Sequence, residues 1–121
     1  MKKIDEILTM LNTNKIKVRL VHGMFFECGG VVGNSPEKPE IFYVWLNAEY
    51  VEDEILSSFK HELWHIACND FESRDSVNRI EAIAHTAQKH NFYGFFDGVD
   101  LKPYLENAKV ITYEGKEKKS A

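Results

Sequence analysis

Five residues near the middle of this 121-residue chain, His61-Glu62-Leu63-Trp64-His65, read H-E-x-x-H. Side chains four positions apart share one face of a helix, so His61 and His65 can reach a single metal ion if this segment is helical. Glu62 lies beside that face, where its carboxylate can take a proton from a water molecule activated by the metal. The motif therefore predicts a helix at the edge of the core, with two candidate metal ligands and a candidate general base.

A catalytic zinc site generally takes three protein ligands, so the third must come from elsewhere in the chain. Glu81 is the first candidate, because it lies beside the predicted buried stripe of the following helix and is followed by small alanines. His85, one helical turn later, is the main alternative, and it is also a candidate partner that orients a ligand or donates to an oxyanion. Asp70 and Glu72 are further alternatives. Two imidazoles with a carboxylate favour zinc among the divalent metals.

Hydrophobic spacing predicts an α+β fold, with a small antiparallel or mixed sheet packed against helices. Helical spacing predicts helices over residues 3–13, from 50–52 to about 68, and from 75 or 76 to about 90. Strands are predicted over residues 16–20, 24–28, 41–46 and 110–113. Gly29, Gly30 and Gly33 suggest a bend or bulge between strands, since they lack the lysine of a phosphate-binding loop. We expect residues 1–113 to form a single domain and residues 114–121 to be a mobile tail.

Each of the two later predicted helices has an apolar stripe that should face the core. The stripe of the helix with the histidine motif contains Ile55, Phe59, Leu63, Ile66 and Ala67. The stripe of the following helix contains Val77, Ile80, Ile83, Ala84 and Ala87. The aromatic residues from Phe92 to Phe96 are also expected to lie mainly in the core.

Composition narrows the expected partners and compartment. The formal net charge of −4 argues against a broad phosphate-binding surface, so no direct nucleic-acid partner is expected. No apolar run approaches the roughly 20 residues of a membrane span, and the N-terminus lacks the apolar region of a secretory signal. Cys28 and Cys68 fit no close-spaced metal or redox pattern, which favours reduced thiols. We therefore expect a cytoplasmic protein without a membrane partner.

Several of these segments together resemble the gluzincin group, and more narrowly the ImmA/IrrE-type metallopeptidases of phages and mobile elements. A strand that ends in Asn, residues 41–47, precedes the motif helix, and residues 59–66 are similar to the family's motif helix. Glu81-Ala82 resembles the family's later Glu-Ala pair. The resemblance implies a zincin-like domain in which His61, His65 and Glu81 bind zinc and Glu62 is the general base. It also implies cleavage of a protein partner, often a transcriptional repressor of a mobile element.

The sequence thus predicts a zinc-dependent metallopeptidase whose substrate is a protein, with a transcriptional regulator as one expected class. Candidate donors to the oxyanion formed during cleavage are His85, His90, Tyr93 and Tyr50. The alternative is a catalytically silent zincin-fold binding module, such as a phage-encoded inhibitor of a host protein. The small size of the chain motivates that alternative, as do Trp64, where the family usually has Gly, and the short spacing between His65 and Glu81. A metal that only stabilises the fold is a third hypothesis.

Overall fold

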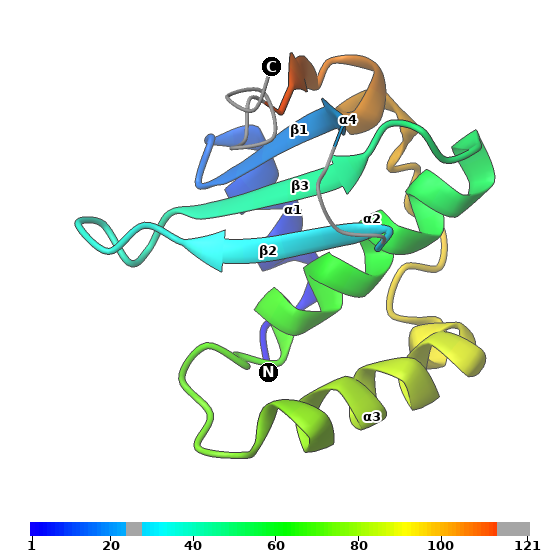
Figure 1. The fold of residues 1–121 in the computed structure, drawn as a ribbon. Coiled ribbons are helices and arrows are strands. Elements are labelled where there is room, and N and C mark those ends of the chain that lie inside the picture. The colour runs from blue at the N-terminus through cyan, green and yellow to red at the C-terminus, as the bar shows by residue number, and fades with distance from the viewer. Residues whose placement is uncertain (24–27, 114–121) are drawn as a thin grey trace.

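The computed structural model describes residues 1–23 and 28–113, which form an α+β fold with four α-helices, a short 3-10 helix and a four-stranded sheet (Figure 1). In chain order the elements are α1 (Ile4–Asn12), β1 (Ile16–His22), β2 (Gly30–Asn34), β3 (Phe42–Asn47), α2 (Glu52–Ala67), α3 (Val77–Lys89), η1 (Asn91–Gly94), α4 (Lys102–Glu106) and β4 (Lys109–Thr112). The expected α+β class is confirmed. The bounds predicted for the three helices and for three of the four strands lie within a few residues of the observed ones. Residues 24–27 of the remaining predicted strand, and the predicted tail 114–121, lie outside the described residues.

The sheet is mixed, with the strand order β2-β3-β1-β4. β1 lies between β3 and β4 and runs parallel to both, whereas β2 pairs with β3 in the antiparallel direction. β2 and β4 are therefore the two edges of this sheet. The alternating apolar residues of β1 and β3 place Val18 opposite Val44, and both side chains are buried.

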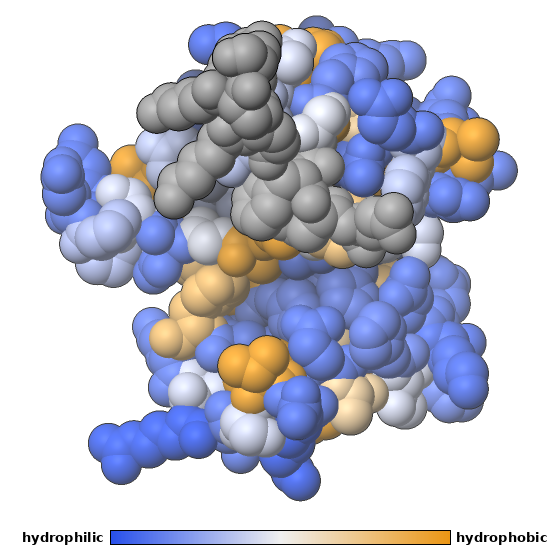
Figure 2. Space-filling view, in the orientation of Figure 1, coloured by the Kyte–Doolittle hydropathy of each residue, from blue (hydrophilic) through white to orange (hydrophobic). Residues whose placement is uncertain are grey.

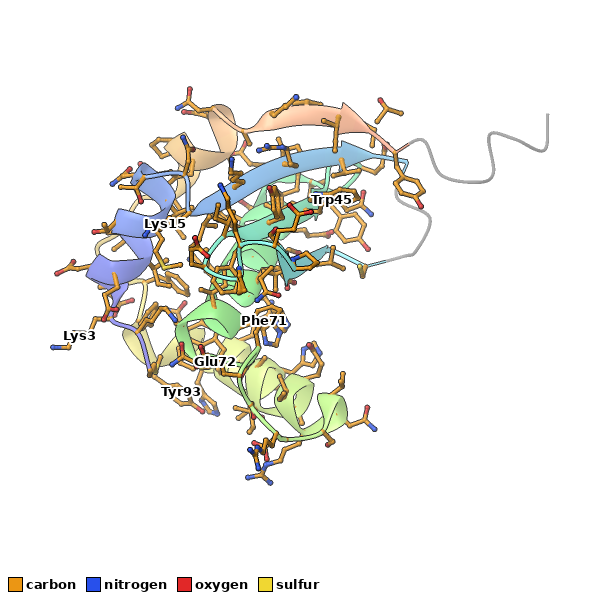
Figure 3. All side chains as sticks on the ribbon, turned by 90° about the vertical axis from the view of Figure 1, so that its left-hand side faces the viewer. Lys3, Lys15, Trp45, Phe71, Glu72 and Tyr93 are labelled. Atoms are coloured by element: carbon orange, nitrogen blue, oxygen red, sulfur yellow. The ribbon has the colours of Figure 1, made fainter. Side chains whose placement is uncertain are left out.

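Helix α2 packs against the sheet on one side and against α3 on the other (Figures 1 and 3). Its residues Phe59, Leu63 and Ile66 are fully buried, and they share one core cluster with Val44 and Leu46 of the sheet. Burial of each such large apolar side chain contributes about 1.5–3 kcal/mol to folding. The histidine motif thus lies in the second half of a helix that the core holds firmly in place.

The glycine-rich segment differs from the expected bend, because Gly30 and Gly33 belong to strand β2. A Cβ atom on Gly30 would lie 2.9 Å from the backbone oxygen of Trp45 and 3.5 Å from Cγ of Glu62, and one on Gly29 would collide with the side chain of Ser58. The absence of these side chains lets the beginning of β2 lie close against α2. This approach brings the edge strand next to Glu62.

The predicted apolar stripe of α3 is wrong at two positions. Ala84 and Ala87 are buried, but Val77 is 74% exposed and Ile83 is 48% exposed. For Ile83 the reason is that the face of α3 toward α2 carries Glu81 together with small residues, and Ile83 lies roughly 200° around the helix from Glu81. Val77 shares the face of Glu81 but is the first residue of α3. The side of α3 that faces α2 therefore makes polar contacts through Glu81 and Gln88, where the hydrophobic pattern predicted apolar packing.

After α3 the chain reverses through a short left-handed segment. Asn91, Phe92 and Tyr93 each have a φ of 52°, a conformation that costs non-glycine residues free energy, and Gly94 follows with a φ of 79°. This turn buries Phe92 and Phe96 in the core, as expected, while Tyr93 is 65% exposed. Packing of the buried rings offsets the backbone strain.

Both cysteines are free, which excludes a Cys28–Cys68 disulfide in this structure. Burial raises the pKa of the Cys68 thiol to about 11, so the thiol is protonated at neutral pH.

None of the helices in residues 1–23 and 28–113 has the length and apolar character needed to cross a membrane.

Candidate metal centre

Three side chains from two helices converge beside the edge strand: His61 and His65 from α2, and Glu81 from α3. The Nε2 atoms of the two histidines lie 3.2 Å apart. Oε1 of Glu81 lies 3.2 Å from Nε2 of His61, and Oε2 lies 3.1 Å from Nε2 of His65. The sequence motif and the acid proposed from the next helix thus form one cluster that could hold a metal ion.

The Nδ1 atoms on the other side of both imidazole rings have partners of their own. Nδ1 of His65 donates to Oδ2 of Asp70 at 2.8 Å. Nδ1 of His61 donates to Oε1 of Gln88 at 3.0 Å, and the Gln88 amide in turn donates to the Ser57 hydroxyl at 2.7 Å. Acceptors at Nδ1 fix the tautomer and the ring orientation, as they do for metal-binding histidines in general.

The chemistry of these three groups fits a divalent cation. With both Nδ1 atoms donating protons, each Nε2 of a neutral imidazole presents a lone pair toward the other and toward the Glu81 carboxylate. Such an arrangement is repulsive unless a cation or protons lie among the three groups. In a tetrahedral zinc site with bonds of about 2.0–2.1 Å, ligand atoms lie about 3.3 Å apart, close to the separations found here.

Glu62 is buried beside this cluster, with only 7% of its surface exposed. Burial raises the pKa of its carboxyl group to about 7, with a smaller contribution in the same direction from the negative charge of Glu81 and an opposing one from His65. A carboxyl group with a pKa near neutrality is suited to accept and return a proton during one reaction cycle.

A cleft of about 430 Å³ opens over the cluster, between strand β2 and helix α3. Its lining combines the beginning of the edge strand, residues 28–31, with Glu62, His61, Glu81 and His85. In the space-filling view, hydrophilic side chains occupy the middle of the area between β2 and α3, and hydrophobic ones lie at its margin (Figure 2). Because 45% of the Glu81 side chain is exposed, the cluster is accessible from the cleft.

The structure separates the alternatives for the third ligand. His85 lines the cleft, but its Nε2 lies 3.9 Å from Oε1 of Glu81 and 68% of its side chain is exposed. Asp70 contacts His65 at Nδ1, on the side of the ring away from the cluster. Glu72 is exposed and is not part of the cluster. Glu81 is therefore the acid that the fold brings to both histidines.

The candidate oxyanion donors also differ in position. His85 is the one candidate that lines the cleft, and its ring centroid lies 5.1 Å from that of His61. His90 stacks on Tyr93 at the end of α3, with ring centroids 5.6 Å apart, and neither residue lines the cleft. Tyr50 is also outside the lining, although its ring lies near Gly29.

Trp64 is directed away from the cluster, into the aromatic residues that follow α3. Its ring centroid lies 5.6 Å from those of Phe92 and Phe95. The side chain is buried, and its Nε1 has no hydrogen-bond partner in the described part of the chain. Trp64 is thus a packing residue, and its ring does not line the cleft.

Sequence reasoning missed the supporting role of Gln88 and considered Asp70 only as a ligand. The position of Gln88 carried a signal, since it lies seven residues after Glu81 and hence on nearly the same face of α3. Cys28 was also not connected with the site, although it lines the cleft. Burial raises the pKa of its thiol, which keeps it protonated at neutral pH.

Comparison of the chain with family models, curated proteins and solved structures finds no match.

Proposed function

We propose that this protein is a zinc-dependent metallopeptidase with a zincin-like fold, in which His61, His65 and Glu81 hold the metal and Glu62 is the general base. The observation that carries the proposal is the convergence of three electron-pair donors within 3.1–3.2 Å, next to a buried carboxyl group. The hydrogen bonds from Nδ1 of each histidine support a metal-binding role over a purely structural one.

A bound zinc ion would polarise the scissile carbonyl and acidify a water molecule in the cleft. Glu62 takes the proton from this water as it attacks the carbonyl carbon. The same carboxyl group then returns the proton to the leaving amine. His85, which lines the cleft, is the donor to the oxyanion that we propose among the four candidates.

The substrate we propose is an extended segment of a protein, aligned along strand β2. Within the described sheet β2 pairs with β3 on one side, so its other side is an edge. An extended peptide can add to such an edge through main-chain hydrogen bonds. Residues 28–31 line the cleft together with Glu62, so a peptide bound there would pass next to the general base.

The resemblance to ImmA/IrrE-type enzymes suggests a transcriptional regulator of a phage or mobile element as the substrate, and the cytoplasm as the compartment. The free cysteines and the reduced state expected for them agree with this compartment.

The proposal is tested with zinc-loaded wild-type protein and with Glu62→Gln, each incubated with a mixture of proteome-derived peptides. New N-termini are then identified by mass spectrometry. We expect wild-type protein to generate new termini and Glu62→Gln to lose this activity by about 10²-fold or more, because the general base is removed. Glu72→Gln is the matched control, since it makes the same change at an exposed acid outside the cluster.

Zinc content and circular dichroism of the Glu62→Gln variant must match the wild type for the comparison to hold. Equal cleavage by both proteins would contradict the proposed mechanism. If the wild type cleaves nothing, and Glu62→Gln has the same effect as the wild type on the cells that produce it, the binding-module alternative is favoured.

A further inference from the structure

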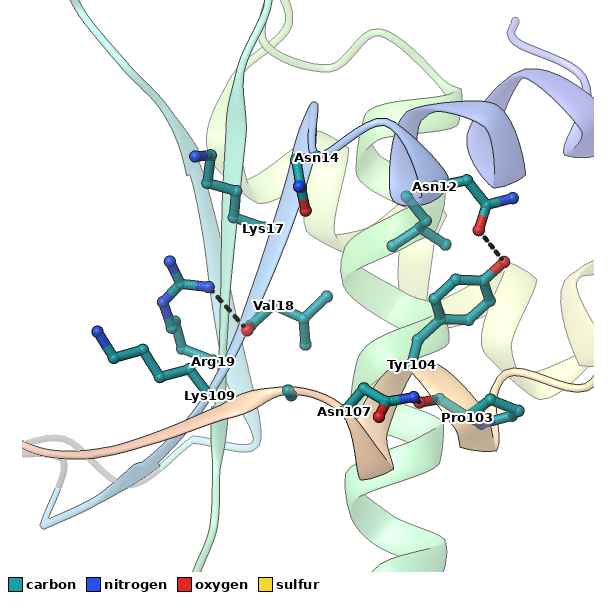
Figure 4. A pocket seen from close by; sticks show the side chains of 11 residues that line it. Asn12, Asn14, Lys17, Val18, Arg19, Pro103, Tyr104, Asn107 and Lys109 are labelled. Atoms are coloured by element: carbon teal, nitrogen blue, oxygen red, sulfur yellow. Dashed lines mark hydrogen bonds between the residues drawn. The ribbon is translucent and has the colours of Figure 1, made fainter.

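A second cavity, of about 480 Å³, lies at the other edge of the sheet, where β1 and β4 meet α4 and the end of α1 (Figure 4). β4 begins opposite Arg19, so the earlier residues of β1 have no neighbouring strand on this side among the described residues. The cavity occupies the notch that this late start leaves. The metal centre lies beside β2, at the opposite end of the strand order, so the two sites are separate.

Three cationic side chains gather at this notch. Lys17 and Arg19 are two positions apart on β1 and so share one face of the strand, and Lys109 is the register partner of Arg19 on β4. Figure 4 shows the three side chains on the same side of β1. In residues 1–23 and 28–113 none of them forms a salt bridge, and the cavity lining contains no carboxylate.

Hydrogen bonds hold polar groups in place on both sides of β1, with the cations on one side and the Tyr104–Asn12 pair on the other (Figure 4). Nη1 of Arg19 donates to the backbone oxygen of Val18 at 3.1 Å, which anchors the guanidinium, and a guanidinium has further N–H groups that can donate to a ligand. On the far wall the Tyr104 hydroxyl donates to Oδ1 of Asn12 at 2.9 Å. This wall thus presents the aromatic ring of Tyr104 and the side-chain amide of Asn12.

We propose that this cavity binds a small phosphate-bearing compound of about nucleotide size. Three cations without an ionic partner among residues 1–23 and 28–113, in a chain with a net charge of −4, create a local positive potential that suits a multiply charged anion. Arginine with flanking lysines can form charge-assisted hydrogen bonds to several phosphate oxygens at once. The volume lies within the range of small-molecule sites.

A nucleic-acid strand fits these observations less well. Its binding requires a broad basic surface along many phosphates, whereas the cations here are confined to one notch in an acidic protein. The ligand proposed is therefore compact. Binding of a nucleic-acid strand is tested as the competing result.

The test is a titration of metal-free protein with pyrophosphate and with ADP, followed by isothermal titration calorimetry and by backbone amide NMR shifts. Metal-free protein is used because zinc itself would bind phosphate. We expect binding with a dissociation constant below about 1 mM, with the largest shifts at residues 17–19 and 107–109. The Lys17→Gln/Lys109→Gln double variant should bind at least about tenfold more weakly, because two charge-assisted contacts are lost. Lys38→Gln, which neutralises an exposed loop lysine, should bind within about twofold of wild type.

Circular dichroism of the metal-free double variant, and the zinc that it takes up when zinc is added back, report whether it folds. Arg19→Lys provides a second variant that keeps the charge but loses the planar guanidinium. Weaker binding by Arg19→Lys supports the proposal. The proposal is overturned if neither ligand binds, if the double variant binds as well as wild type, or if the shifts lie on α2 and α3. It is also overturned if a single-stranded oligonucleotide binds more tightly than ADP through the same lysines.

Discussion

Nδ1 of His65 lies 2.8 Å from Oδ2 of Asp70, and this contact determines which nitrogen of the imidazole faces Glu81. A carboxylate only accepts hydrogen bonds, so Nδ1 carries the proton and Nε2 presents its lone pair to the cluster. Asp70 follows α2, at a distance of five residues from the histidine that it orients. The motif helix therefore supplies a candidate ligand, and the turn directly after it supplies the group that positions this ligand.

Replacing Asp70 with Ala should weaken zinc binding by about 10–100-fold, because the ring of His65 loses its fixed tautomer and orientation. Competition with a chromophoric chelator measures the affinity. Glu72→Ala is the matched control, since it removes a nearby exposed acid that is not part of the cluster, and its affinity should be that of the wild type. Unchanged zinc affinity in Asp70→Ala would show that this hydrogen bond does not orient a metal ligand.

Gln88 should behave in the same way toward His61, whose Nδ1 donates to the Gln88 side-chain oxygen at 3.0 Å. Gln88→Ala removes the acceptor and is expected to reduce zinc affinity about tenfold or more. Gln88→Glu keeps an acceptor at this position and should retain most of the affinity. The same chelator competition distinguishes the two variants, and equal losses in both would argue against the orienting role.

The buried carboxyl group of Glu62 makes the stability of the metal-free protein depend on pH. Its pKa is near 4.5 in the unfolded chain and about 7 in the fold, so the folded state binds a proton more tightly. This group therefore causes the free energy of unfolding to fall as the pH rises from about 4.5 to about 7, with no further loss above that. Glu62→Gln should stabilise the metal-free protein at pH 8 by up to about 3 kcal/mol, and by much less at pH 5.

Urea unfolding of both proteins at the two pH values measures this difference. Saturating zinc should reduce it, because the charge of the ion favours the ionised carboxylate. A stabilisation of the same size at pH 5 and pH 8 would contradict the assigned proton affinity of Glu62.

Trp64 should affect stability and leave the metal centre intact. Trp64→Ala is expected to lower the free energy of unfolding by about 3–5 kcal/mol, because a large ring is lost from the contacts with Phe92 and Phe95. Trp64→Phe should cost less than about 1.5 kcal/mol, since it keeps an aromatic ring and removes a buried N–H that has no partner in the described residues. Chemical denaturation gives the stabilities. A loss of zinc affinity in the well-folded Phe variant would place Trp64 in the site.

Much of the site could be predicted from the sequence because it depends on helical spacing. His61 and His65 are one turn apart, and helical spacing made Glu81 the first of several candidates for the third ligand, with His85, Asp70 and Glu72 as alternatives. Asp70 and Gln88 were not assigned their contacts, because a hydrogen bond between side chains of different segments depends on how those segments pack. The spacing of residues within one segment does not predict how that segment packs against another.

The fold was less predictable where tertiary packing overrides local preference. Strand β2 contains Gly30 and Gly33, and glycine normally argues against a strand, yet here it permits close contact with α2. Ile83 matched the apolar period of α3 but is exposed, because that helix presents Glu81 and small residues to its neighbour. Helix α4 spans five residues and contains Pro103, so helical periodicity gave no signal for it.

The most direct test of the central claim is a crystal structure of zinc-loaded protein with anomalous data collected on both sides of the zinc absorption edge. We predict one zinc ion per chain, bound by Nε2 of His61, Nε2 of His65 and a carboxylate oxygen of Glu81, with a further position open toward the cleft. An ion held by His85 in place of Glu81, a site closed by four protein ligands, or no ion at these residues would contradict the account.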